Sequence, residues 1–182
     1  TAAKILKENG YFVIVASFRE EPLMDDILSD GIPVLIDQSI SDYRWRLPED
    51  VPSTISHSIN FIIHDFDLVF VNTFVCHNII NCYNGTNVPL LWWLHEGYTS
   101  FEGDNVKFMP TSLGNNVRVL TGGKYVQKVL KDVGINYFTD SMLYGVEDCS
   151  SPLREKLQEK VRFIFPGSFE KRKNHKVLFE AI

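Results

Sequence analysis

The nine residues Pro89–Gly97, PLLWWLHEG, place a histidine and a carboxylate directly after a run of apolar residues. Such a run predicts a strand buried within a sheet. In open α/β sheets the ligand crevice lies just beyond the carboxyl ends of these strands. His95 is a side chain that can carry a proton or anchor a polar ligand near neutral pH, and Glu96 could tune it. We take this pair as candidate catalytic residues; the alternative is that His95 only caps the strand.

A second candidate site lies in residues 167–174, GSFEKRKN. This segment is a predicted strand-to-helix loop that carries Gly167, Ser168 and three cations, Arg172 and Lys173 among them. Backbone N–H groups at a helix start, combined with cationic side chains, form the arrangement that binds phosphate or diphosphate. The sequence contains neither the P-loop pattern nor GxGxxG. A solvated basic turn explains the same residues equally well.

Three further polar residues stand at the carboxyl ends of predicted strands and are candidates for lining a crevice: Ser17, Asn72 and Thr73. Local capping of the following helix is the favoured interpretation for each. The segment 121–123, TGG, is interpreted first as a strand-end turn and second as a ligand contact. Trp92 and Trp93 point to opposite faces of their strand, and we expect both to pack in the core.

The other histidines show no metal-ligand spacing and receive no role: His57, His64 and His77. Three cysteines, without CxxC spacing, indicate neither a disulfide framework nor a zinc site, and they favour a reducing setting. Cys76 and Cys82 fall in a predicted helix and are expected to be core thiols. We therefore expect no metal and a cytoplasmic protein.

The charge pattern limits the kinds of partner. The 182 residues carry a formal charge of −5, with 18 Lys and Arg against 23 Asp and Glu. Neither the sign nor the clustering suits nucleic acid, so we expect no nucleic-acid partner. No apolar run approaches the roughly 20 residues that a membrane-spanning helix needs, and no signal-peptide pattern is seen.

Strands and helices are predicted to alternate along the chain. Apolar, β-branched runs predict strands at 11–17, 32–39, 67–73, 88–96, 117–122 and 161–169. Helical patterns lie at 2–10, 20–31, 74–85, 123–134, 150–160 and 174–182, and one more is expected within 41–66. Residues 97–116 form a long loop. Because parallel strands need crossover connections, the alternation predicts an α/β fold with a doubly wound, Rossmann-like parallel sheet.

Taken in order, these segments resemble the retaining glycosyltransferases of the GT-B fold, in particular family four, the group one glycosyl transferases. AAKILKENGYFVIVAS resembles the first helix and second strand of the family's acceptor-side domain, FDLVFVNT the strand before its crevice, and VPLLWWLHE the strand that ends in its active-site histidine. LYGVED is similar to the turn into the interdomain linker. FIFPGSFEKRKNHKVLFEAI is similar to the opening strand, donor-phosphate loop and helix of the C-terminal domain.

The resemblance implies that Lys173 contacts the diphosphate of a nucleotide sugar and that Arg172 assists it. Ser168 stands where many members have arginine, and Asn174 where many have glycine, which weakens the arginine half of the phosphate clamp. His95 would lie near the reacting sugar, with Glu96 behind or beside it. The implied partners are a nucleotide-sugar donor and a glycan or lipid-linked acceptor, in surface polysaccharide or glycoconjugate synthesis, without a cofactor. Association with the inner face of the membrane is left open.

The family's glycine-rich loop would precede residue 1, and its acidic motif would follow residue 182. The resemblance thus implies an acceptor-side domain at 1–150 that lacks its first strand, followed by the truncated start of the donor-side domain at 151–182. We expect this extent of chain to be inactive alone, because donor and acceptor must be held in a cleft between domains. A nucleotide-sugar epimerase of GT-B architecture and a non-catalytic Rossmann-like binding module stay open as alternatives.

Overall fold

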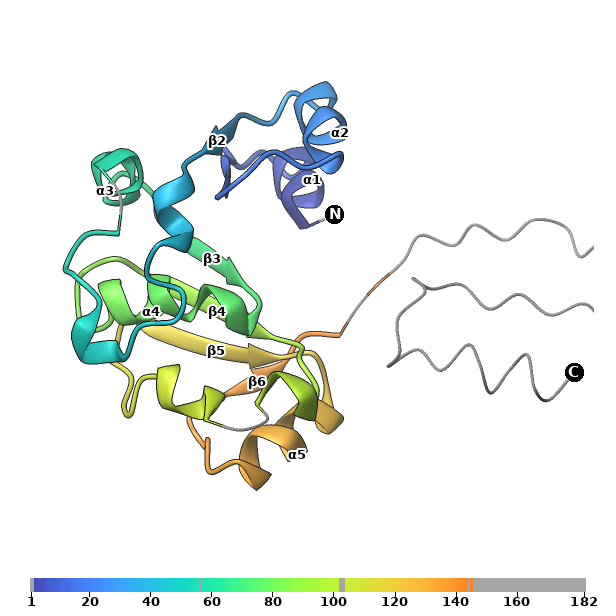
Figure 1. The fold of residues 1–182 in the computed structure, drawn as a ribbon. Coiled ribbons are helices and arrows are strands. Elements are labelled where there is room, and N and C mark those ends of the chain that lie inside the picture. Colours follow the sequence, from blue (N-terminus) through green and yellow to red (C-terminus); the bar gives the residue numbers. More distant parts are fainter. Residues whose placement is uncertain (1, 56, 102–103, 144, 146–182) are drawn as a thin grey trace, which may run out of the picture. The chain divides into compact units, whose positions relative to one another are not determined.

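The computed structural model describes residues 2–55, 57–101, 104–143 and 145. These residues form an α/β fold with two parallel sheets, an arrangement compatible with a Rossmann-like fold (Figure 1). The predicted linker helix and the start of a second domain lie outside the described residues. So do the predicted donor-phosphate residues Gly167, Ser168, Arg172 and Lys173.

The first sheet contains two strands, β1 (Val15–Ser17) and β2 (Val34–Ile36), which pair in parallel. Helices α1 (Ala2–Glu8) and α2 (Leu23–Ser29) each precede one of these strands. The predicted glycine stops are confirmed, because Gly10 and Gly31 follow the two helices with φ of +88° and +68°. The predicted strand at 11–17 is too long: only three of its residues pair with β2, and Tyr11 and Phe12 are exposed.

The second sheet contains four parallel strands in the order β3-β4-β5-β6. They are β3 (Val69–Asn72), β4 (Leu90–Leu94), β5 (Val117–Thr121) and β6 (Asp140–Ser141). The helices of this part are α3 (His57–Ile63), α4 (His77–Tyr83) and α5 (Lys124–Asp132). The predicted α/β class with parallel strands is confirmed, and the described strands divide into two sheets, because β1 bonds only to β2 and β3 bonds only to β4.

Five short 3-10 turns complete the described chain: η1 (Gln38–Ser41), η2 (Pro48–Asp50), η3 (Phe74–Cys76), η4 (Tyr98–Ser100) and η5 (Asn105–Phe108). The last two interrupt the predicted long loop. No described helix combines the length and the apolar character that crossing a membrane requires.

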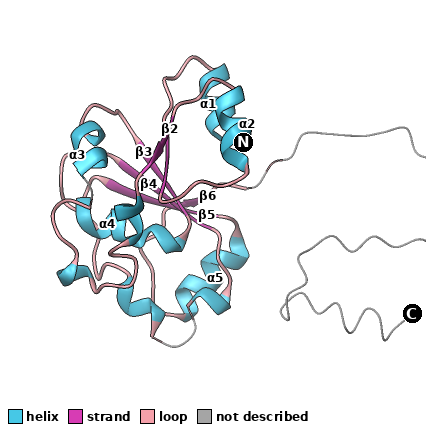
Figure 2. Cartoon of the chain, turned by 45° about the horizontal axis from the view of Figure 1, so that its top comes forward, coloured by secondary structure: helices cyan, strands magenta, loops and turns pink. Residues whose placement is uncertain are grey.

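The core lies on one face of the four-stranded sheet. Leu90, Trp92 and Leu94 of β4 are fully buried, whereas the alternate side chains of this strand are partly exposed. The sequence predicted burial on both faces, and the connections explain the difference. Helices α4 and α5 both join a strand to the next strand in the same direction across the sheet, so right-handed crossovers put both on one face (Figure 2).

Helix α5 packs as its apolar spacing predicts. Val126, Val129 and Leu130 are buried in the cluster that contains the β4 side chains, and Val133 packs partly buried against it. Cys82 is buried in the same cluster, and Cys76 packs against it at the start of α4, as expected for core thiols. The 3.6-residue period therefore identified the inward face of this helix correctly.

His77, the first residue of α4, belongs to the core. Its ring is fully buried and lies 5.3 Å from the ring of Phe74 and 5.6 Å from that of Phe108, between ring centroids. Its Nδ1 lies 3.3 Å from the side-chain nitrogen of Asn81. Burial lowers the pKa of His77 from 6.5 to about 4, because the charged imidazolium loses its hydration there. This histidine is a neutral core residue.

Replacing His77 with glutamine should weaken the pH dependence of stability. Between pH 6.5 and about 4 the unfolded state binds the proton of His77 more tightly than the folded state does. The free energy of unfolding therefore falls as the pH drops through this window, by roughly 2 to 3 kcal/mol from this group. Urea denaturation at pH 7 and pH 4.5 measures the loss. The same change at exposed His64 serves as the control and should keep the wild-type pH dependence; equal losses in both variants would contradict the assignment.

Candidate functional site

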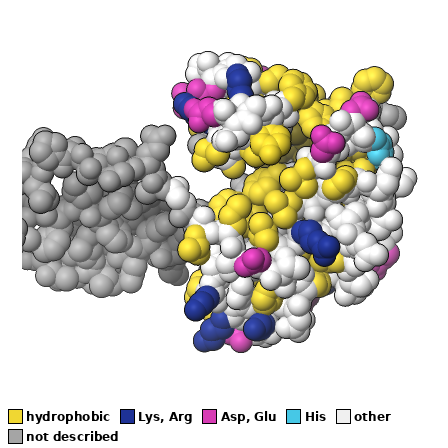
Figure 3. Space-filling view, turned by 180° about the vertical axis from the view of Figure 1, so that it is seen from behind, with side chains coloured by type: hydrophobic (Ala, Val, Ile, Leu, Met, Phe, Trp, Pro, Cys, Tyr) yellow, Lys and Arg dark blue, Asp and Glu magenta, His cyan; other side chains and the backbone are white. Residues whose placement is uncertain are grey.

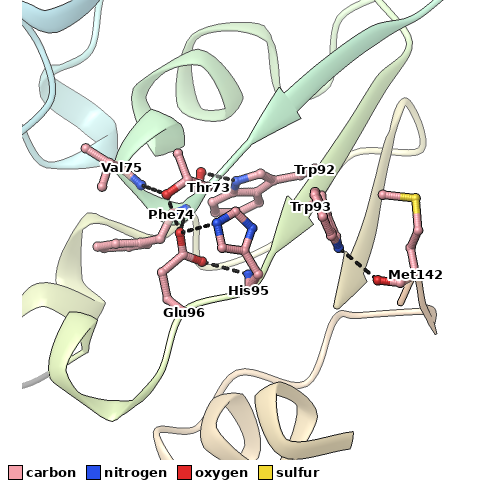
Figure 4. A network of polar contacts seen from close by, with 8 residues as sticks. All are labelled: Thr73, Phe74, Val75, Trp92, Trp93, His95, Glu96 and Met142. Atoms are coloured by element: carbon pink, nitrogen blue, oxygen red, sulfur yellow. Dashed lines mark hydrogen bonds and ion pairs between the residues drawn. The ribbon is translucent and has the colours of Figure 1, made fainter. Parts of the chain in front are cut away.

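The polar residues singled out after β3 and β4 lie at adjacent strand ends. His95 and Glu96 follow β4 directly, and Thr73 follows β3, its neighbour in the sheet. Because the two strands are parallel, their carboxyl ends meet at the same edge (Figure 4). The structure therefore brings three of the predicted site residues together.

The carboxylate of Glu96 ties these two strand ends to each other. Its Oε1 accepts hydrogen bonds from the hydroxyl of Thr73 and, at 2.7 Å, from the backbone N–H of Phe74. Its Oε2 accepts from the backbone N–H of His95 at 2.9 Å. The side chain is only 9% exposed, so these donors replace the water that a buried carboxylate loses.

Thr73 has an unusual backbone conformation. Its φ of +80° and ψ of 151° lie in a region that glycine normally occupies. The conformation is held from several sides: the N–H of Thr73 donates to the carbonyl of Trp93 at 3.0 Å, and its carbonyl accepts from the indole of Trp92 at 3.0 Å. Strained backbone conformations persist only where the surrounding contacts enforce them, and they are common at functional sites.

The two tryptophans of β4 have different roles. Trp92 is fully buried, which confirms the core prediction. Trp93 is only partly buried, and its indole N–H donates to the carbonyl of Met142, beyond β6, at 3.2 Å. Its ring lies edge-on to His95, with 5.0 Å between ring centroids. We expected Trp93 to pack in the core, and this is wrong. Its ring is partly exposed and lies against the imidazole of His95.

The side chain of His95 is more accessible than that of Glu96. Its side chain is 26% exposed, and its Nε2 lies 4.0 Å from Oε1 of Glu96. The imidazole thus has an aromatic ring on one side and a carboxylate close by, while part of it reaches solvent. Such a group can donate or accept a hydrogen bond, or exchange a proton, with a ligand at the sheet edge.

The neighbouring thiol of Cys76 is not suited to nucleophilic chemistry. Burial raises the pKa of this thiol, the Arg44 charge lowers it, and the Glu96 charge raises it again. A raised pKa keeps the sulfur protonated, and the thiolate is the reactive form. The chemistry available at the strand ends therefore rests on His95.

The other predicted crevice residues differ from Thr73. The hydroxyl of Ser17 donates to the carbonyl of Arg19 at 2.9 Å, within its own turn. The expected capping of the following helix is wrong for Ser17, because the N-cap of α2 is Pro22 and no side chain caps this helix. Asn72 is exposed at the end of β3. Thr73 also accepts a hydrogen bond from the N–H of Val75, so it caps η3 as well as bonding Glu96.

A second group of polar contacts lies at the ends of β5 and β6, and the sequence analysis had singled out only residues 121–123 of this group. The hydroxyl of Thr121 lies 3.1 Å from that of Ser141, which accepts from the side chain of Gln127 at 2.8 Å. Gly122 donates its N–H to the carbonyl of Leu94 at 2.7 Å, and Gly123 has a φ of +140°, as expected of a turn. A two-residue polar strand has no apolar run, so β6 was missed.

No group of His, Cys, Asp and Glu within the described ranges is arranged to hold a metal ion. Comparisons of the chain with family models, with curated proteins and with solved structures give no match.

Glu96→Gln should lower the free energy of unfolding by roughly 1.5 to 3 kcal/mol, the range for a buried hydrogen-bonded charge. A glutamine offers one carbonyl oxygen, so its NH₂ group would face a donor where Glu96 now accepts. Urea denaturation measures the change. The control is Glu20→Gln, at an exposed position, which should stay within about 0.5 kcal/mol of the wild type. Wild-type stability in Glu96→Gln would show that the hydrogen bonds accepted by Glu96 do not stabilise the fold.

At Thr73, glycine should be better tolerated than alanine. Both substitutions remove the hydroxyl that bonds Glu96, but only glycine adopts a φ of +80° without strain. We expect Thr73→Gly to be more stable than Thr73→Ala by about 1 kcal/mol or more in thermal and urea unfolding. The exposed Thr111 has no positive φ, and there alanine should be at least as stable as glycine. The same order at both positions would rule out the strained conformation.

Proposed function

We propose that residues 1–150 are the acceptor-side domain of a retaining glycosyltransferase of the GT-B fold, which transfers a sugar from a nucleotide-sugar donor to a glycan or lipid-linked acceptor. The observation that carries the proposal is the position of His95, partly exposed at the carboxyl end of β4 and held there by Glu96. Open α/β sheets bind ligands at this edge. The resemblance of VPLLWWLHE to the family's histidine-bearing strand gives this position its role.

In this proposal His95 touches the reacting sugar and Glu96 is a positioning residue. Both carboxylate oxygens of Glu96 already accept hydrogen bonds, from Thr73, Phe74 and His95. Glu96 therefore acts by fixing the backbone that carries the imidazole. The partly exposed ring of Trp93 restricts the imidazole from one side. A polar group fixed in this way orients a bound sugar at little entropic cost during the reaction.

The donor half of the proposal depends on residues beyond the described ones. Lys173, assisted by Arg172, would stabilise the diphosphate as the bond between the anomeric carbon and the phosphate oxygen breaks. Ser168 and Gly167 would offer hydrogen bonds from the loop. The new bond forms to the oxygen of an acceptor hydroxyl, whose proton passes to the departing diphosphate. The cytoplasmic location and any contact with the membrane surface stay predictions.

Nucleotide binding tests the donor half of this proposal. The protein with both domains complete should be titrated with UDP, GDP and the corresponding sugars while NMR shifts of the histidine side chains are followed. Lys173→Ala should weaken donor binding by roughly 1.5 to 3 kcal/mol, the range for a charge-assisted hydrogen bond. Lys171→Ala, in the same basic cluster, is the control for general charge effects. If no nucleotide perturbs His95, or if both lysine variants lose equal affinity, the proposed assignment fails.

Transfer assays test the acceptor half. His95→Ala should lower kcat/KM by about a hundredfold or more, which corresponds to a lost positioning or proton-carrying group. The free energy of unfolding should change little, because the imidazole is partly exposed. His64→Ala, at an exposed position of the described chain, should leave both quantities unchanged. Isomerisation of the donor sugar without any acceptor would instead indicate an epimerase.

A further inference from the structure

Two arginine side chains meet at the carboxyl end of β1. Phe18 follows this strand directly and packs, partly buried, against the core cluster. The guanidinium carbon of Arg44 lies 4.5 Å from the centroid of the Phe18 ring, and that of Arg19 lies 5.2 Å from it. Both cations therefore lie on one aromatic ring. They are closer to each other than the Debye length of roughly 10 Å, so their charges repel.

The backbone that carries Arg44 is anchored to helix α4. The N–H of Arg44 donates to the carbonyl of Ser41, the last residue of η1, at 3.2 Å. The carbonyl of Ile40, also in η1, accepts from the side chain of Asn78 in α4 at 2.5 Å. The guanidinium group of Arg44 is therefore held from two sides, by this anchored turn and by the ring of Phe18.

The charge of Arg44 reaches the residues that follow β3. Burial raises the pKa of the Cys76 thiol, the charge of Arg44 opposes this rise, and the charge of Glu96 adds to it. Cys76 ends η3, the turn that begins right after Thr73. Arg44 therefore lies near the same sheet edge as Glu96, and open α/β sheets bind ligands at this edge.

Arg44 has no carboxylate partner within the part of the chain that the structure describes. The ion pairs found there join other residues, although the side chain of Arg44 is partly buried. Glu96 does not fill this role, because its two oxygens already accept hydrogen bonds from other groups. Arg19 donates to Glu21 from its Nε, which is not one of its two terminal nitrogens. A cation that is partly removed from water is stabilised by an anion.

We propose that Arg44 and Arg19 bind a phosphoryl group at the carboxyl ends of β1 and β3. A guanidinium group matches phosphate because it can donate two parallel hydrogen bonds to its oxygens. An anion between the two cations also removes their repulsion. By contrast, Figure 3 shows apolar side chains gathered around a hollow on one face of the described residues, and such a surface offers a phosphoryl group few donors. This inference does not depend on the proposed function, which assigns the donor diphosphate to Lys173.

NMR with inorganic phosphate tests this site on the 182-residue chain. At constant ionic strength, phosphate should shift the Nε–H signals of Arg44 and Arg19 in a saturable way. Arg44→Gln should weaken the affinity measured at the amide of Phe18 about tenfold or more, because charge-assisted hydrogen bonds are lost. Arg44→Lys should weaken it less, since an ammonium group keeps the charge but lacks the planar fork. Equal shifts with sodium chloride in place of phosphate would overturn the proposal.

Three further variants separate this site from general charge effects. Arg118→Gln, at an exposed position of β5, should keep the wild-type affinity for phosphate. Lys173→Ala should keep it too, and a lost response of Arg44 in that variant would assign the anion to the basic cluster instead. Arg19→Gln changes a side chain that is 64% exposed, so it leaves the core intact and should weaken phosphate binding. Wild-type affinity in Arg19→Gln and Arg44→Gln alike would refute the site.

Urea unfolding separates ligand binding from a purely structural role. Added phosphate should raise the unfolding midpoint of the wild type more than that of Arg44→Gln, because a ligand stabilises only the state that binds it. If Arg44 serves only to hold Phe18, Arg44→Gln should lower the midpoint and leave the phosphate affinity unchanged. That result would count against a phosphoryl site.

Vesicles identify the source of the phosphoryl group. The chain should be sedimented with vesicles of phosphatidylglycerol, and with vesicles of neutral phosphatidylcholine as the control. Binding to phosphatidylglycerol alone that is lost in Arg44→Gln supports a lipid headgroup. A phosphate response without vesicle binding supports a soluble phosphorylated ligand. Vesicle binding that Arg44→Gln leaves unchanged, together with no phosphate response, would overturn both.

Discussion

The buried carboxylate of Glu96 is the interaction on which the geometry of the strand ends depends. A charge that is 9% exposed must be surrounded by donors, and here they come from Thr73, Phe74 and His95. These donors belong to the ends of two neighbouring strands, so satisfying one carboxylate fixes two loops at once. The strained backbone of Thr73 is held by the same set of contacts. These contacts also fix the backbone of His95, and they thereby set the position of its partly exposed imidazole.

Strand β4 links its own end to the ends of two other strands through the hydrogen bonds of its tryptophans. Its two indoles lie on opposite faces, and one N–H reaches Thr73 after β3 while the other reaches Met142 after β6. Three strand ends are therefore linked through consecutive residues of one strand. This arrangement explains why an apolar run ends abruptly in polar residues. The apolar part buries the strand, and the residues that follow it satisfy backbone and side-chain groups at the edge where ligands bind in α/β folds.

The sequence by itself determined the order of the described helices and strands apart from β6, the glycine stops after α1 and α2, the inward face of α5 and the position of His95 and Glu96 at a strand end. These features follow from local periodicity and turn chemistry, which a single segment carries. Only the tertiary structure decided that Thr73 bonds Glu96, that Trp93 flanks His95 and that β6 exists. It also decided that the strands divide into two sheets. These features depend on which strand ends meet and which edges pair, and residues distant in the sequence set those contacts.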